Sequence, residues 1–185
     1  MSAPAVLPSV CEYNVVMVRI AHVLDTWKAV RQDTIAAVEE FPAGELDFRP
    51  TPDVMTFGEL ARHILMAGDG LTGMLLAGEE NFATPDARDK IRAKSRSAGE
   101  DAASVAAALR ESIEERTAEL AARPPEFFAQ IVTRMDGVKL TRLEMLQTIK
   151  EHELVHRANL FMYMRIKGMV PATTRRRAAA KAPAR

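Results

Sequence analysis

Apolar side chains recur at three- and four-residue spacing over four long stretches of this 185-residue chain. In an α-helix that spacing places them on one face, which packs against other elements while polar residues cover the opposite face. We therefore predict four long helices, over residues 15–40, 56–78, 102–122 and 141–167. Prolines mark two of their ends, Pro42 after the first helix and Pro124 after the third, because proline interrupts helical hydrogen bonding.

Two of these helices begin with a capping box. In each, a threonine is followed three residues later by a glutamate, as in Thr56 with Glu59 and Thr141 with Glu144. The threonine oxygen accepts a hydrogen bond from the glutamate amide, and the glutamate carboxylate accepts one from the threonine amide. The pattern predicts that the second and fourth helices start directly after Thr56 and Thr141.

The segments between the helices have little regular pattern. Residues 42–55 are proline-rich, and residues 79–101 are polar enough to predict a long loop with at most one short helical turn. Residues 127–138 contain a short extended piece and an Asp136-Gly137 turn signal. Since no pair of alternating strands is convincing, we predict an all-α fold, a four-helix bundle over residues 14–171 preceded by an N-terminal extension, 1–13.

The last fourteen residues, 172–185, differ in composition from the rest of the chain. They contain five basic residues but no acid and no large apolar side chain, so we predict a disordered basic tail. The whole chain has 25 basic and 25 acidic residues, which leaves 20 basic residues against 25 acidic ones in residues 1–171. An acidic bundle argues against specific nucleic-acid binding, although the tail could give weak, salt-sensitive contact with polyanions.

Three further features indicate the cellular compartment. No apolar run is long enough to cross a membrane, and the first residues lack the charged start of a signal peptide. The single cysteine, Cys11, cannot form an intramolecular disulfide. We therefore expect a cytoplasmic protein.

Helical geometry separates the four histidines. His22 points away from the apolar stripe of the first helix, which predicts an exposed side chain without a functional role. His63 lies at the edge of the apolar stripe of the second helix, where it can point into the bundle. His152 and His156 stand four residues apart, so they share one face of the fourth helix. Three histidines are therefore candidates for one site.

A divalent metal would satisfy these three histidines together. A buried polar group without a partner costs about 1–3 kcal/mol, and neutral imidazole is a good ligand for Zn²⁺. Three protein ligands leave a coordination position open, as in catalytic zinc sites. Chance spacing and hydrogen bonding inside the bundle remain the alternative. Asn159 and Tyr163, on the same face, would either support a ligand, contact substrate or hydrogen bond within the bundle.

Two motifs lie in the second and fourth helices, TFGELARHI at residues 56–64 and EHELVHRANL at residues 151–160, the latter followed by YMRIKGMVP at 163–171. Their order and separation resemble the damage-inducible DinB-like family, which is distinct from the DNA polymerase of the same name. The resemblance covers about residues 15–171. This chain reads His156-Arg157-Ala158-Asn159 where many members have His-Arg-Gly-Gln, and it ends in a basic tail, so a relative's substrate does not transfer to it.

The resemblance implies an up-up-down-down bundle, often dimeric, with a three-histidine site for a divalent metal such as zinc or nickel. By motif position the ligands would be His63, His152 and His156. Related proteins use low-molecular-weight thiols as cosubstrates in transferase or isomerase reactions. The resemblance thus implies a small-molecule substrate and a metal-dependent thiol transferase or hydrolase.

A non-catalytic alternative stays open. In it the bundle binds a metal or small ligand, or serves as an interaction module in a stress response. We also predict a homodimer, because the fourth helix carries a second apolar set, Leu143, Leu154 and Phe161, opposite its histidine face.

Overall fold

The structure is a computed structural model, which describes residues 19–181. Its elements in chain order are α1 Ile20–Glu40, a 3₁₀ helix Ala43–Glu45, α2 Phe57–Leu76, α3 Ala87–Lys94, α4 Ala102–Ala121, α5 Pro125–Ala129, β1 Ile131–Thr133, β2 Lys139–Thr141, α6 Arg142–Ile166 and α7 Ala172–Lys181. The four predicted long helices are confirmed as α1, α2, α4 and α6. The predicted N-terminal extension and the first residues of the first helix lie outside the described residues.

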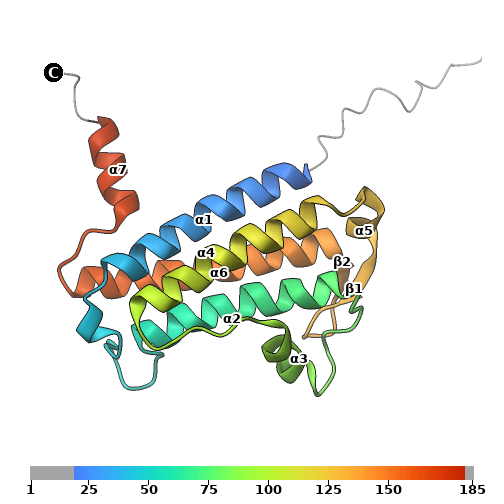
Figure 1. Cartoon of the computed structure of the whole chain (residues 1–185), viewed down its shortest axis with the longest axis horizontal. Coiled ribbons are helices and arrows are strands. Elements are labelled where there is room, and N and C mark those ends of the chain that lie inside the picture. Colours follow the sequence, from blue (N-terminus) through green and yellow to red (C-terminus); the bar gives the residue numbers. More distant parts are fainter. Residues whose placement is uncertain (1–18, 182–185) are drawn as a thin grey trace, which may run out of the picture.

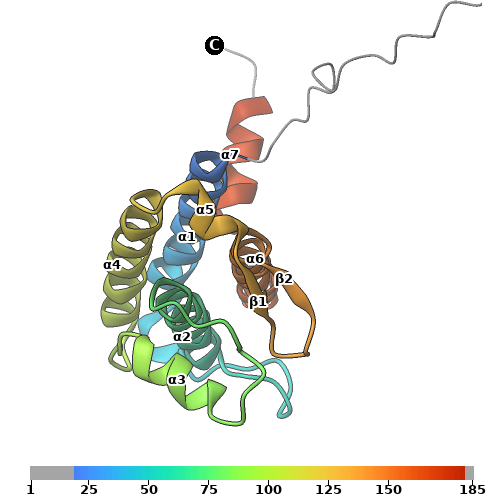
Figure 2. The same ribbon diagram turned by 90° about the vertical axis from the view of Figure 1, so that its right-hand side faces the viewer.

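The four long helices form a bundle in which α1 packs against α4 and α6, and α2 packs against the same two helices (Figures 1 and 2). Helices α1 and α6 run in one direction, and α2 and α4 run in the other (Figure 1). The chain therefore goes up, down, down and up, so the up-up-down-down expectation is wrong. The reason is the connection over residues 77–101, which is long enough to return along the bundle before α4 begins.

Both predicted capping boxes are present. The Thr56 amide donates to the Glu59 carboxylate at 2.7 Å, and the Glu59 amide donates to Thr56 Oγ1 at 3.1 Å. The equivalent distances at Thr141 and Glu144 are 2.7 Å and 3.2 Å. These caps fix where α2 and α6 begin, and hence which side chains each helix turns toward the core.

The predicted long loop contains a helix of eight residues, α3, which packs on α2. Gly70 permits the close approach, since a Cβ there would lie only 2.3 Å from the Ile91 carbonyl oxygen. Asp69, which is fully buried, accepts hydrogen bonds from the Arg96 amide at 2.6 Å and from Arg116 Nε at 2.9 Å. Two contacts thus hold α3 on the bundle: Ile91 packs on Gly70, and the Arg96 amide, two residues after the helix ends, binds Asp69.

The predicted extended piece is a small antiparallel hairpin, β1 with β2, preceded by the short helix α5. Ile131 pairs with Thr141 and Thr133 pairs with Lys139. The turn uses Gly137 at φ 84°, a left-handed conformation that glycine adopts without strain. The hairpin leads directly into α6 and lies beside it (Figure 2).

The prediction of a disordered tail is wrong over Ala172–Lys181, which form α7. No residue of α7 is buried. Its arginines instead pair with acids of α1: Arg175 with Glu40 at 2.5 Å, and Arg176 with Asp33. Alanine favours helix formation, and these ion pairs partly replace the apolar contacts that the tail lacks. Residues 182–185 lie outside the described part.

A buried polar network joins α6 to α1. Glu153 of α6 is buried and accepts hydrogen bonds from Trp27 Nε1 at 2.7 Å, Arg31 Nε at 2.7 Å, Arg31 Nη2 at 2.8 Å and Thr34 Oγ1 at 2.9 Å. All three partners belong to α1 and are themselves buried. Because the carboxylate can meet these donors in one orientation, the network fixes the rotation of α6 relative to α1.

One face of α6 is open to solvent. Val155 is 60% exposed and Ile166 is 54% exposed, with Met162 between them. The covered part of α6 faces α1 and α2 and, near its start, α5 and the hairpin. Among the described residues, no helix is both long and apolar enough to cross a membrane.

Candidate metal centre

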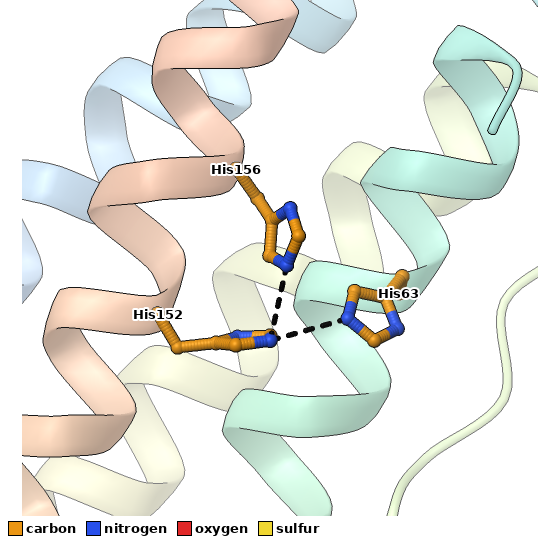
Figure 3. Close-up of side chains that lie close together, drawn as sticks. All are labelled: His63, His152 and His156. Carbon is orange, nitrogen blue, oxygen red and sulfur yellow. Dashed lines mark hydrogen bonds between the residues drawn. The ribbon is translucent and has the colours of Figure 1, made fainter. Parts of the chain in front are cut away.

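Three histidine side chains from two helices meet between α2 and α6 (Figure 3). His63 Nε2 lies 3.2 Å from His152 Nε2, and His156 Nε2 lies 3.0 Å from the same atom. All three rings are half-buried. His22, by contrast, is exposed on α1, as predicted.

The positions of these rings follow from the local sequence. The Thr56 cap starts α2 so that His63 falls in its second turn, on the side facing α6. His152 and His156 are one helical turn apart, and the buried Glu153 between them holds that part of α6 against α1. The two helices therefore present their imidazoles to one point.

The donor set fits a divalent metal. Tetrahedral ligands at about 2.0–2.1 Å from Zn²⁺ lie about 3.3–3.4 Å from one another. The two measured Nε2 separations, 3.2 Å and 3.0 Å, are close to this spacing. The ligand atoms of all three histidines lie within 4.8 Å of one another, and no carboxylate belongs to this group. A small contraction or rotation of the rings would suffice to coordinate one ion.

The site keeps its imidazoles neutral, which is the form that binds metal. Burial lowers the pKa of His152 to about 4, and the neighbouring His156 and His63 contribute to the shift. Burial also lowers the pKa of His63 and, together with His63, that of His156. The three nitrogens are thus available at neutral pH without the loss of a proton. His156 Nδ1 is buried and has no hydrogen-bond partner in the described part of the chain.

A pocket of about 670 Å³ opens beside this cluster. His63 and His152 line it, together with apolar side chains from α2, α3 and α6, Met66, Leu71, Ile91, Met145 and Ile149. Its charged lining residues come from α3 and the hairpin, Arg88, Arg92, Arg134 and Asp136. The volume is in the range of small-molecule sites, whose walls are also mainly apolar.

The two supporting residues predicted from the sequence lie elsewhere. Asn159 is exposed and does not line the pocket. Tyr163 is buried, and its hydroxyl donates to the Met55 carbonyl at 3.0 Å. Since Met55 does line the pocket, Tyr163 supports its wall from behind.

Sequence reasoning missed the Glu153 network and the arginines of the pocket. A signal for the first exists, because Arg31 and Glu153 are opposite charges that fall on the core stripes of the first and fourth helices. No comparable signal marks the arginines. They become neighbours of the histidines only through the packing of α3 and the hairpin.

A four-helix bundle with three convergent, neutral imidazoles defines a candidate metalloprotein. The sequence profile of the DinB superfamily matches residues 26–160, a range that includes all three histidines. The chain belongs to this superfamily.

Solved structures with the same fold include the DinB-like protein YjoA from Bacillus subtilis, which is 21% identical at a TM-score of 0.63 and aligns over 80% of this chain and 93% of its own. YfiT from Bacillus subtilis, described as a probable metal-dependent hydrolase with an unusual four-helix bundle topology, is 16% identical with a TM-score of 0.63, over 89% and 94%.

A third structure is a mycothiol-dependent maleylpyruvate isomerase, 14% identical with a TM-score of 0.60, over 77% of this chain and 61% of that one. At these identities the likeness shows the fold. No curated protein sequence matches the chain.

Proposed function

We propose that the protein is a divalent-metal-dependent enzyme whose metal is held by His63, His152 and His156. The observation that carries the proposal is the convergence of three half-buried Nε2 atoms on one point, with two separations of 3.2 Å and 3.0 Å. Zinc or nickel is the expected ion, because imidazole suits both and no carboxylate is present to favour magnesium or calcium.

When bound, such a metal lowers the pKa of a water or thiol and polarises a substrate carbonyl. The protein's own residues supply the surroundings. Three imidazoles fix the ion at the wall of the pocket, and the apolar side chains around it keep bulk water from competing. Among the described residues that line the pocket there is no cysteine, serine or lysine, and the hydroxyl is that of Thr148. We therefore infer that the bound metal supplies the reactive group. Such chemistry favours transfer of a group to a bound small molecule, or its hydrolysis.

A low-molecular-weight thiol is the proposed cosubstrate. One structural relative is a mycothiol-dependent isomerase, and another is described as a probable metal-dependent hydrolase. A thiol would use the open coordination position that three protein ligands leave. Such cosubstrates belong to reducing compartments, and we accordingly propose that the protein works in the cytoplasm.

Cobalt substitution tests this proposal. We expect Co²⁺ to bind to metal-free protein and a small thiol, 2-mercaptoethanol, to produce a sulfur-to-cobalt charge-transfer band in the near ultraviolet. His63→Ala and His156→Ala should abolish the band, and His22→Ala, an exposed histidine on α1, should leave it unchanged.

Two results would count against the assignment. Bound cobalt without a band after thiol addition would reject the thiol and favour hydrolysis or the non-catalytic alternative. An equal band in the histidine variants would reject the site itself.

A homodimer through α6 completes the proposal. Leu143 and Phe161, which suggested the contact, pack partly against the core. The exposed apolar side chains of α6 are instead Val155, Met162 and Ile166, spaced seven and four residues apart on one stripe. Sedimentation at micromolar concentration should give a dimer that Met162→Lys dissociates and Ile131→Lys, an equally exposed apolar position on β1, does not.

A further inference from the structure

The pocket beside the histidines has a local charge opposite to that of the bundle. Its charged lining residues are three arginines, Arg88, Arg92 and Arg134, and one acid, Asp136. Residues 1–171 as a whole carry 20 basic and 25 acidic residues. An excess of guanidinium groups on one apolar pocket of an acidic bundle indicates an anionic ligand.

Two of these arginines stand on a helix that is held in place. Arg88 and Arg92 are four residues apart on α3, so they project from the same face. Ala87 and Ile91 of the same helix are buried, and Ile91 packs directly on Gly70 of α2. The arginine side chains themselves are exposed. Helix α3 therefore presents two cations to the pocket from a fixed backbone.

The partners of these arginines are weak or replaceable. Arg92 pairs with Asp89 at 3.2 Å, and both side chains are exposed. Arg134 pairs with Asp136 of the same hairpin through two hydrogen bonds, from Nε to Oδ1 at 2.9 Å and from Nη2 to Oδ2 at 2.5 Å. Arg88 has no ion pair in the described part of the chain. A single exposed ion pair such as that of Arg92 with Asp89 contributes about 0–1 kcal/mol, so an anionic ligand can compete for the guanidinium groups of α3. The bidentate pair of Arg134 is stronger, which makes Arg134 the lesser contributor.

The dimensions of the pocket also set the length of a ligand that would fill it. Along α2 it extends from His63 to Leu71, eight residues or about 12 Å, and along α6 from His152 back to Met145, about 10 Å. Helix α3 contacts α2 at Gly70, near the end away from His63. The arginines of α3 are thus separated from the histidines by an apolar stretch about two helical turns long.

We propose that Arg88, Arg92 and Arg134 form an anion-binding subsite, and that the substrate is an amphiphilic anion. Its apolar body lies along Met66, Ile91 and Met145, its carboxylate, sulfonate or phosphate end meets the arginines, and its reactive end reaches the histidines. Only the last of these placements rests on the proposed metal-dependent function. Guanidinium groups suit such oxyanions because they donate two parallel hydrogen bonds.

A matched pair of probes tests the subsite without involving the metal. An alkanesulfonate is a poor metal ligand but a good guanidinium partner, and the corresponding alkyl methyl sulfone has a similar shape without charge. Calorimetry at low ionic strength, on zinc-loaded and on metal-free protein, should show the sulfonate binding about tenfold more tightly. Shifts of the methionine methyl resonances in NMR spectra would place both probes in the pocket.

Variants separate the subsite from general charge effects. Arg88→Ala combined with Arg92→Ala should reduce the preference for sulfonate to about twofold or less, and Arg134→Ala alone should reduce it in part. Arg110→Ala is the control, because Arg110 is an exposed arginine on α4 that pairs with Glu39 and does not line the pocket. All variants should keep the circular dichroism spectrum and thermal midpoint of the wild type.

Three results would overturn the subsite. They are equal affinity for sulfonate and sulfone, no binding of either probe, and a preference that survives in the double variant. Each is independent of the cobalt experiment. A protein that binds no metal can still prefer the sulfonate, and a metal enzyme can lack the preference.

Discussion

Replacing Glu153 with glutamine tests how the bundle holds its histidine face. The Glu153 carboxylate accepts four hydrogen bonds from Trp27, Arg31 and Thr34, and every partner is buried. Glutamine keeps the size of the side chain but turns an amide NH₂ toward a donor. It also leaves the Arg31 guanidinium, whose side chain is 0% exposed, without its counter-charge.

The expected cost follows from that geometry. Removing one partner of a buried ion pair lowers the free energy of unfolding by about 3–5 kcal/mol, because the remaining charge stays desolvated. For a chain of this size each kcal/mol lowers the thermal midpoint by about 2–4 °C, so Glu153→Gln should lose about 6–20 °C.

Urea unfolding followed by tryptophan fluorescence measures this directly, since Trp27 is the single tryptophan of the chain and lies in the network. Glu114→Gln is the matched control, because its 2.8 Å pair with Lys28 is solvent-exposed and should contribute about 0–1 kcal/mol. The reasoning is refuted if Glu153→Gln unfolds within about 1 kcal/mol of the wild type, as the control should.

Three further predictions concern other parts of the molecule. In metal-free protein the pKa of His152 is lowered to about 4, so the unfolded chain binds more protons than the folded chain between pH 6.5 and about 4. The free energy of unfolding should therefore fall as pH decreases through this range, and it should fall less steeply in His152→Gln. Gly70→Ala should lower the free energy of unfolding by about 1–3 kcal/mol in urea titrations because its Cβ meets the Ile91 backbone, whereas Gly44→Ala, with open space around it, should not. Deleting residues 172–185 should change the thermal midpoint little at physiological salt, since α7 buries no residue and pairs with α1 through exposed arginines; a fall above about 5 °C would contradict this.

The sequence was most informative where a local pattern, such as a helix cap or apolar spacing, also determines which side chains pack in the core. Capping at Thr56 and Thr141 locates α2 and α6 to within a residue, and the three-, four- and seven-residue spacing of apolar positions locates the core faces. His63, His152 and His156 were identified because helical geometry sends them inward.

What could not be predicted depends on tertiary contact. Arg31 and Glu153 each stand out as a charge on a core stripe, but they are 122 positions apart in the chain, and only the packing of α6 on α1 makes them a pair. Helix α3 is strongly polar and gains its place from the glycine of α2 on which it packs. Val155 and Ile166 look like core residues in the sequence, yet they face solvent because the elements that pack on α6 in the described part of the chain leave that stripe uncovered.

Metal content is the most direct test of the central claim that His63, His152 and His156 form one metal centre. Elemental analysis of purified protein after incubation with zinc or nickel should find stoichiometric metal in the wild type and in His22→Ala. The same analysis should find little in His63→Ala, His152→Ala and His156→Ala, each shown to be folded by circular dichroism. Equal, substoichiometric metal in all five proteins would contradict the account.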